Sequence, residues 1–289
     1  YDIENLIQRE AKVVTVTQTG YIKRVALSAY RAQRRGGKGR SGMATKEGDF
    51  LTKVFVCDTH TPVLFFSTRG IVYRLKVYRL PEATPQGRGK ALINLLPLDH
   101  GETVSTVIPM PEYEGAWGEL DIVFATASGG VRRNRLSDFT NINVNGKIAM
   151  KLDDDDRIVA VRICTEQDDI LLSAHGGKCV RFPTTDVRVF KGRSSQGVRW
   201  MKLAEGDEVI SMSILRHIEL DTDERDAYLR SATRQRRDED GEEGGAAMDV
   251  VIGAERGATL GATEEFILGI TENGYGKRTS AYEYRITKR

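Results

Sequence analysis

Apolar residues gather in short runs that recur along the chain. Five times, a run of Val, Ile, Leu or Phe enters a turn centred on glycine and leaves through a run that carries basic residues. Runs of this length are typical of strands, and X-Gly pairs supply the positive φ that tight hairpin turns require. We therefore predict five β-hairpins, Val13–Arg24, Val63–Arg74, Ile122–Arg133, Ile170–Arg181 and Phe266–Arg278.

A second glycine follows each of the first four hairpins after 17–20 residues, in basic surroundings at Gly39, Gly89, Gly146 and Gly197. An acidic turn and a further apolar run come next, which makes about four strands per unit. Repeats of 40–50 residues with four strands are typical of blades arranged around an axis. Helical periodicity is hard to find. We therefore predict one all-β, propeller-like domain over 1–289, with four-stranded blades that start near 13, 63, 122, 170 and 266 and a truncated last blade.

The gap between the fourth and fifth hairpins is about twice the repeat and is acidic. Residues 217–249 carry eleven acidic and five basic residues. Because the whole chain has a net charge of +2 and this segment has −6, the remainder carries +8. A segment with few apolar residues and many charges cannot offset its ordering entropy by burial. We predict that 217–257 is a disordered acidic insertion between two blades; a degenerate extra blade is the alternative.

Other classes of protein find little support. No run approaches the roughly 18 apolar residues of a membrane helix, and residues 1–5 do not resemble a secretion signal. The three cysteines fit neither a disulfide framework nor a zinc pattern, which favours a reducing cytosol. The four histidines are scattered, and Gly87-Arg88-Gly89-Lys90 lacks the first glycine of a nucleotide-binding loop. The acidic run 153–156 is interpreted as a solvated turn rather than a metal site. We predict no catalytic residue, metal or cofactor in this chain.

One segment packs three cations into five residues beside glycines. Glycines allow close approach to a phosphate chain and present backbone N–H groups to it. Arg and Lys neutralise phosphates and release counterions, so binding should weaken steeply with salt. Nothing here is placed to read base edges, so the segment should position DNA without specifying sequence. A flexible, solvated basic loop is the alternative that the segment alone leaves open. Its residues are Gln33, Arg34, Arg35, Gly36, Gly37, Lys38 and Gly39.

This segment resembles the "box" motif of the C-terminal domain of the DNA gyrase A protein. The resemblance extends over the chain through AYRAQRRGGKG (29–39), VYRLPEATPQGRGKALINLLPL (77–98) and ENGYGKRT (272–279). It implies a six-bladed β-pinwheel, a propeller-like disc whose neighbouring blades exchange strands. It also implies that double-stranded DNA wraps around the basic rim with positive handedness, and that the box is needed for this wrap.

The resemblance further implies a larger assembly. The parent protein would be DNA gyrase, an ATP-dependent type II topoisomerase that introduces negative supercoils, with ATP and Mg²⁺ bound on other domains. The partners would be the rest of the gyrase A protein and the gyrase B protein, in an A2B2 heterotetramer in the bacterial cytoplasm at the nucleoid, with no membrane. The alternative is a propeller that scaffolds protein partners, but a scaffold needs no phosphate ligands at repeated positions.

The repeats also place cations at similar positions in successive units. We predict that phosphate ligands along the rim come from these residues, although some of them will only be solvated strand faces. The candidates are Arg24, Arg74, Arg79, Arg88, Lys90, Arg133, Lys178, Arg181, Arg193, Lys277 and Arg278.

Overall fold

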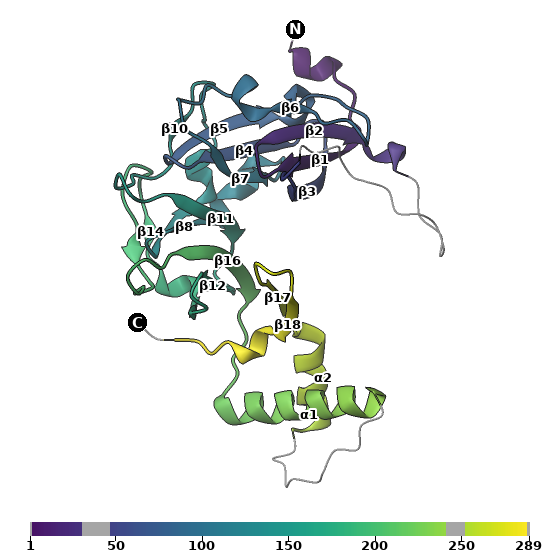
Figure 1. Cartoon of the computed structure of the whole chain (residues 1–289), viewed down its shortest axis with the longest axis vertical. Coiled ribbons are helices and arrows are strands. Elements are labelled where there is room, and N and C mark those ends of the chain that lie inside the picture. The colour runs from purple at the N-terminus through teal and green to yellow at the C-terminus, as the bar shows by residue number, and fades with distance from the viewer. Residues whose placement is uncertain (1, 31–46, 241–251, 288–289) are drawn as a thin grey trace.

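The computed structural model describes residues 2–30, 47–240 and 252–287 of the chain. Small sheets follow one another along a curved row, and each contains one of the five predicted hairpins (Figure 1). The hairpins are β1 (Ala11–Thr17) with β2 (Tyr21–Ala26), β4 (Pro62–Ser67) with β5 (Ile71–Lys76), β8 (Asp121–Thr126) with β9 (Gly130–Arg135), β12 (Asp168–Ala174) with β13 (Cys179–Pro183), and β17 (Phe266–Ile270) with β18 (Gly276–Ser280). We number the sheets that contain them blades 1 to 5. The all-β, propeller-like prediction is confirmed for these blades.

A third strand pairs with the first strand of the hairpin in each of blades 1 to 4. These third strands are β3 (Leu51–Asp58), β7 (Val104–Pro109), β11 (Ile158–Cys164) and β16 (Val209–Arg216). They lie on the inner, concave side of the row in Figure 1, where β11 packs beside both β7 and β16.

Neighbouring blades exchange short strands on the outer, convex side. Strand β6 (Lys90–Ala91) comes from the second repeat but pairs with β2 of blade 1, and β10 (Lys147–Ile148) comes from the third repeat but pairs with β5. Both β14 (Val189–Phe190) and β15 (Val198–Arg199) come from the fourth repeat and pair with β9. The predicted four strands are therefore present in blades 1 and 2, whereas blade 3 has five, and blades 4 and 5 have three and two among the described residues.

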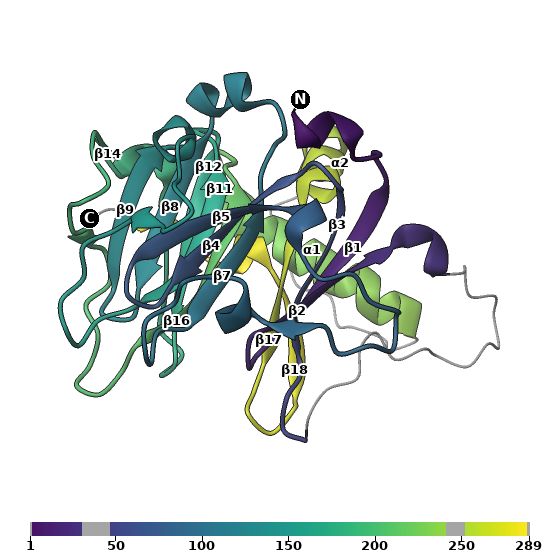
Figure 2. The same ribbon diagram turned by 90° about the horizontal axis from the view of Figure 1, so that it is seen from above.

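A 3₁₀ turn follows the second strand of every hairpin. The turns that follow the hairpins of blades 2 to 5 begin the segments that cross to the preceding blade, and Figure 2 shows one such crossing from above, where β14 lies beside β9. The turns after the five hairpins are η2 (Leu27–Ala29), η3 (Val77–Arg79), η6 (Leu136–Phe139), η7 (Thr184–Asp186) and η8 (Ala281–Glu283), and the remaining ones are η1 (Ile3–Leu6), η4 (Leu92–Asn94) and η5 (Glu114–Glu119).

The hydrophobic core lies between the blades rather than within them. Separate buried clusters join blades 1 and 2, blades 2 and 3, and blades 3 and 4. In the second cluster, Phe66 of blade 2 meets Phe124 of blade 3 edge to face, with ring centroids 5.5 Å apart. The two tryptophans serve packing: Trp117 is fully buried, and Trp200 stacks on Phe182 at 4.2 Å. Each blade is therefore stabilised mainly by its neighbours, as in other repeat proteins.

The prediction of a disordered insertion over 217–257 is wrong for the residues that the structure describes there. They form α1 (Thr222–Asp240) and the start of α2 (Ala254–Thr263), and they contain no strand of a degenerate blade. The sequence contains the signals of a helix N-terminus, which a count of charges alone does not reveal. Asp221 accepts a hydrogen bond from the backbone N–H of Glu224 at 2.8 Å, and acidic residues in the first turn with Arg237 in the last suit the helix dipole.

Both helices pack under blade 5. Tyr228 of α1 meets Tyr282 of η8 edge to face at 5.5 Å, and the Tyr282 hydroxyl donates to the carbonyl oxygen of Leu260 at 2.7 Å. The Tyr228 hydroxyl donates to Glu264 at 2.6 Å. A few well-placed aromatic contacts thus give a mostly charged segment enough burial to fold. Neither of these helices, nor any other helix among the described residues, is long and apolar enough to cross a membrane.

Candidate nucleic-acid interface

The segments that cross between blades form the outer rim of the molecule. We define the rim segments as residues 79–98, 140–151 and 187–202, which carry the exchanged strands β6, β10, and β14 with β15. In the second, third and fourth repeats, the second glycine lies where a rim segment crosses the preceding hairpin. At Gly89, with φ +79°, an added Cβ would lie 2.2 Å from the carbonyl oxygen of Ile22. At Gly197 it would lie 2.5 Å from that of Val131. The repeated glycines therefore allow this close approach of backbones.

Three predicted rim cations lie exposed on the first rim segment. Arg79 stands over the ring of Tyr78 at 5.5 Å, and Arg88 stands over the ring of Tyr21 at 5.8 Å. Lys90 is exposed on β6. Within the described part of the chain, none of the three forms an ion pair with a carboxylate. Their charged donors therefore face solvent and are available to a polyanion.

The third rim segment is the most cationic. Arg193 is half-buried and donates to the carbonyl oxygen of Ile148 at 3.5 Å. Sequence reasoning missed the other cations on this segment, and it also missed Lys151 on the second rim segment. The signal that could have found them is the second-glycine position, because every one of them lies within ten residues of Gly146 or Gly197. The missed residues are Lys151, Arg188, Lys191, Arg199 and Lys202, all exposed.

Arg133 is not placed to bind phosphate, and its prediction as a rim ligand is corrected. Its side chain is 4% exposed and its Nε donates to Asp121 Oδ2 at 2.9 Å. Its Nη1 donates to the carbonyl oxygens of Thr184 and Val187 at 3.1 and 3.0 Å. Its Nη2 contacts Asp121 Oδ2 at 2.7 Å and donates to Glu166 at 2.9 Å. Every nitrogen of the guanidinium therefore has a protein partner.

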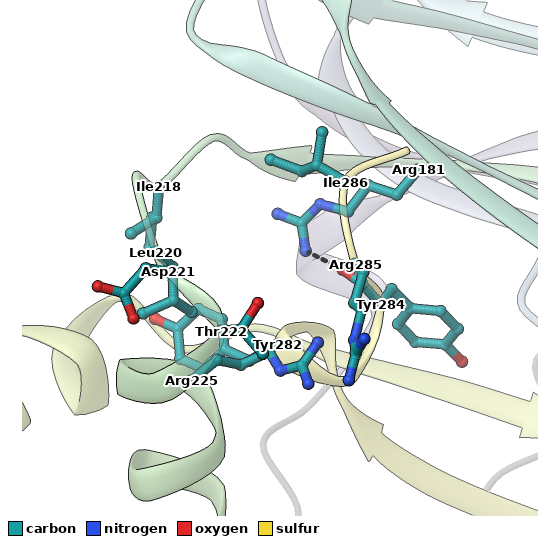
Figure 3. A pocket seen from close by; sticks show the side chains of 10 residues that line it. All are labelled: Arg181, Ile218, Leu220, Asp221, Thr222, Arg225, Tyr282, Tyr284, Arg285 and Ile286. Carbon is teal, nitrogen blue, oxygen red and sulfur yellow. Dashed lines mark hydrogen bonds between the residues drawn. The ribbon is translucent and has the colours of Figure 1, made fainter. Parts of the chain in front are cut away.

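Arg181 is corrected for the same reason. Its Nε donates to the fully buried Asp169 at 2.9 Å, and its Nη1 donates to the carbonyl oxygens of Ala281 at 2.8 Å and Tyr284 at 3.4 Å. Figure 3 shows the guanidinium turned toward the backbone that leads to Ile286, inside a cavity of about 180 Å³ between blade 4, η8 and the start of α1. In both cases the sequence pattern identified a repeated cation but not its depth.

The remaining predicted residues divide by exposure. Arg24 and Arg74 are half-buried, and each donates to a backbone carbonyl oxygen of the next repeat, Leu80 at 2.8 Å and Thr140 at 2.6 Å. Lys178 is exposed and donates to the carbonyl oxygen of Lys202 at 2.6 Å. On blade 5, Lys277 and Arg278 are exposed, and Arg278 stands over Phe266 at 3.7 Å. The predicted box, residues 33–39, lies outside the described residues.

Two further cations are buried, Lys23 beside Arg24 and Arg132 beside Arg133. Lys23 is fully buried, and its Nζ reaches the carbonyl oxygens of Thr84, Pro85 and Gly87 at 2.6–3.1 Å. Arg132 is also fully buried, and burial lowers its pKa to about 10. It stays charged at neutral pH, because carbonyl oxygens replace the lost water.

The acidic turns cap the hairpins. Asp156 accepts hydrogen bonds from the backbone N–H of Ser128 at 3.0 Å and from its hydroxyl at 2.6 Å. Asp49 holds Thr19 in the same way, at 3.0 and 2.6 Å. No group of three or more His, Cys, Asp or Glu within the described ranges is arranged to hold a metal ion. What the described surface offers is a convex rim of solvent-facing cations that repeats from blade to blade.

Comparison with known protein families identifies the repeats. The family model described as "DNA gyrase C-terminal domain, beta-propeller" matches residues 11–58, 61–109, 120–165, 168–216 and 265–289. The five matches coincide with the five blades and leave the helical insertion unmatched.

The chain is similar along its whole length to the DNA gyrase A protein from several bacteria. It is 52% identical over 290 residues to that of Rickettsia bellii (strain RML369-C), and 36% identical over 288 residues to that of Escherichia coli (strain K12). Both alignments cover 100% of this chain but only 32% and 27% of the relatives. The chain thus spans about a third of the length of these relatives.

Solved structures support the fold. The C-terminal domain of DNA topoisomerase IV matches with a TM-score of 0.65 at 22% identity, over 98% of this chain and 71% of that one. A DNA gyrase A C-terminal domain matches with a TM-score of 0.64 at 24% identity, over 97% of this chain and 75% of that one.

Proposed function

The chain belongs to the family of DNA gyrase A C-terminal domains, and from this premise we propose that it binds double-stranded DNA along its rim and wraps it with positive handedness. The observation that carries the proposal is the row of exposed cations on the rim segments of successive blades, on the convex side of the row (Figure 1). A convex surface with phosphate ligands at repeated intervals is suited to bent duplex, because each blade can hold a further stretch of backbone.

Wrapping has to offset the stiffness of DNA. Bending 20–30 base pairs by 40–90° costs on the order of 1–6 kcal/mol. Several phosphate contacts spread over successive blades can supply this, and none of them requires a particular base. We therefore propose a sequence-tolerant interaction, with Arg79, Arg88 and Lys90 on the first rim segment and Arg188, Lys191 and Arg199 on the third as phosphate ligands.

The proposal includes the box, residues 33–39, as a second class of contact. Its three cations and its glycines fit phosphate binding, and the family resemblance gives it the role of completing the wrap. In the whole protein, wrapping would present a positively crossed DNA segment to an ATP-driven, Mg²⁺-dependent enzyme made with the rest of the gyrase A protein and with the gyrase B protein. The product would be negatively supercoiled DNA in the bacterial cytoplasm.

Ligation of nicked circular DNA in the presence of the chain tests this function. We expect the linking number of the products to shift toward positive supercoils. The triple variant Arg34→Ala, Arg35→Ala, Lys38→Ala should lose the shift while keeping considerable binding to short duplex. A matched control removes exposed cations from the inner strands β11 and β16, Arg162→Ala with Arg216→Ala, and should keep the shift. Salt-sensitive binding without any shift would contradict wrapping, and equal loss of binding and wrapping in the triple variant would make the box an affinity patch.

A further inference from the structure

The second strand of each hairpin places an arginine four residues after the glycine of the turn. The spacing is the same in all five blades, so these arginines occupy equivalent places in the repeat. The pairs are Gly20 and Arg24, Gly70 and Arg74, Gly129 and Arg133, Gly177 and Arg181, and Gly274 and Arg278.

In blades 1 to 4 this arginine reaches out of its own blade to the 3₁₀ turn of the next repeat. Arg24 donates to the carbonyl oxygen of Leu80, directly after η3, and Arg74 to that of Thr140, directly after η6. Arg133 donates to carbonyl oxygens at both ends of η7, and Arg181 to those at both ends of η8. Four equivalent arginines thus hold four equivalent turns.

The turns that they hold are the roots of the segments that cross between blades. Leu80 lies next to Arg79, Thr140 begins the second rim segment, and Val187 begins the third. A rim segment pairs with the preceding blade through exchanged strands of only two residues each, supplemented by single backbone hydrogen bonds such as that from the Leu92 N–H to the carbonyl oxygen of Gly20 at 2.8 Å. Such short strands supply few backbone hydrogen bonds, whereas a guanidinium supplies charge-assisted bonds in a fixed geometry.

The residue before the arginine contributes to the same junction in two blades. Lys23 binds the carbonyl oxygens of Thr84, Pro85 and Gly87, immediately before Arg88. Arg132 donates to the carbonyl oxygens of Arg193 and Ser195 at 2.7 and 2.6 Å. Cations inside the blades therefore fix the backbone from which the exposed rim cations project.

We infer that Arg24, Arg74, Arg133 and Arg181 are inter-blade clasps, positioning residues that tie each blade to the 3₁₀ turn of the next repeat without touching DNA themselves, and that the first three set the place of the rim segments. The inference rests on the proposed function, since it explains how the surface that would wrap DNA is held in position. Arg278 is the equivalent residue of blade 5. Within the described residues it reaches no 3₁₀ turn and stands over Phe266 instead.

Arg74 gives the sharpest test, because it is half-buried and its carboxylate partner Glu114 is 42% exposed. Replacing Arg74 therefore leaves no buried carboxylate without a partner. Arg74→Lys keeps the positive charge that a phosphate ligand needs but cannot reproduce the guanidinium contacts to Thr140 and Glu114. Arg74→Gln removes the charge as well. Arg24→Lys repeats the test at the first clasp, should the Arg74 variants fail to fold, and Arg162→Lys on the inner strand β11 is the control.

Three measurements are made on the 289-residue chain. They are hydrogen exchange of the amides of residues 146–150 without DNA, the linking-number shift on nicked circles, and the salt dependence of binding to a duplex of about 20 base pairs, too short to wrap. We expect Arg74→Lys to raise exchange in 146–150 about tenfold and to reduce the linking-number shift about twofold or more. Its salt slope on short duplex should equal that of the unaltered chain, because the variant removes no phosphate ligand.

Wild-type exchange and wrapping in Arg74→Lys would overturn the inference. If in addition Arg74→Gln made the salt slope shallower by about 0.9, Arg74 would be a phosphate ligand instead. The two proposals fail separately. An unaltered chain that produces no linking-number shift refutes wrapping, while the exchange measurement still decides whether Arg74 is a clasp.

Discussion

The second strands of the hairpins and the rim segments that cross them are both rich in arginine and lysine, but they use these residues in opposite ways. Lys23, Arg132 and Arg133 lie buried inside the blades, and every charge is met by carbonyl oxygens or a carboxylate. Arg88 and Lys90 lie on the rim, exposed and without an ion pair in the part of the chain that the structure describes.

The difference shows that burial from solvent decides the role of a repeated cation. Removing a charge from water is costly unless the protein supplies its hydrogen bonds, so a buried cation must be saturated by the fold. Burial indeed lowers the pKa of Lys23, which three carbonyl oxygens surround. A saturated cation has no donor left for phosphate, whereas an exposed one keeps its donors and contributes little to stability. Inner cations should therefore control folding and geometry, and rim cations should control affinity.

The largest effect on folding is expected for Arg133→Leu. It leaves Asp121, whose side chain is 1% exposed, without its Nε and Nη2 partners. Breaking a buried pair typically costs about 3–5 kcal/mol, and the lower end is expected because Arg135 still holds the other carboxylate oxygen at 2.7 Å. Urea denaturation measures the loss. The double variant Arg133→Leu, Asp121→Leu should recover a substantial part, and no recovery would show that the backbone contacts, not the ion pair, dominate.

A smaller loss is expected for Gly89→Ala, which tests how closely the rim is held to the blade. The positive φ of +79° and the 2.2 Å approach to the carbonyl oxygen of Ile22 both oppose a Cβ. We expect a destabilisation of roughly 2–3 kcal/mol. Gly101→Ala is the matched control, with φ +78° and no atom within 4 Å of the added carbon. Equal losses in the two variants, measured by thermal unfolding, would mean that the close crossing adds nothing beyond the backbone conformation.

The sequence predicts the hairpins well, because each is a local pattern of an apolar run, a turn glycine and a second run. The sequence also shows the second glycines of the repeats. The reason why glycine is needed there is the crossing of a rim segment over the preceding hairpin, and this crossing depends on contacts between residues tens of positions apart. Burial is not a local property either. Arg133 and Arg278 both stand four residues after a turn glycine, but the packing of the next repeat covers only Arg133. The sequence therefore identifies the repeated cations but not how deeply each of them is buried.

The insertion shows a different limit. Its charge count predicts disorder, and the helix start at Asp221 is visible only when capping is considered apart from composition. The apolar contacts that support α1, such as Tyr228 against Tyr282, come from a residue of the fifth repeat. No reading of 217–257 in isolation could supply that partner.

A moderate, pH-dependent effect is expected where blade 4 meets the insertion. His217 shares the buried Asp169 with Arg181, at 2.7 Å, and also contacts Glu219 at 3.1 Å. Burial acts to lower the pKa of His217, but the hydrogen bonds and charges of Glu219 and Asp169 outweigh it and raise the pKa above 6.5. This stabilisation is fully present below pH 6.5 and is lost as the pH rises through the raised value.

Denaturation across that pH range should show the loss, at below about 1.5 kcal/mol, and His217→Gln should flatten it. Exposed His175, paired with Glu272 at 3.0 Å, is the control, and His175→Gln should change the pH dependence less. A profile that stays unchanged in His217→Gln would mean that Asp169 is satisfied by Arg181 alone, and that the clasp of blade 4 is insensitive to pH.

The smallest effect on folding is expected at the rim, where the same type of residue should matter most for binding. The triple variant Arg188→Ala, Lys191→Ala, Arg199→Ala removes three exposed cations from the third rim segment. Because none of them is buried or ion-paired within the described chain, the free energy of unfolding should change by less than about 0.5 kcal/mol. The plot of log K against log salt for duplex DNA should become shallower by about 0.9 for each phosphate ligand that the variant removes. A large loss of stability with an unchanged salt slope would reverse the division between inner and rim cations, since it would make these residues structural and leave DNA binding to another face.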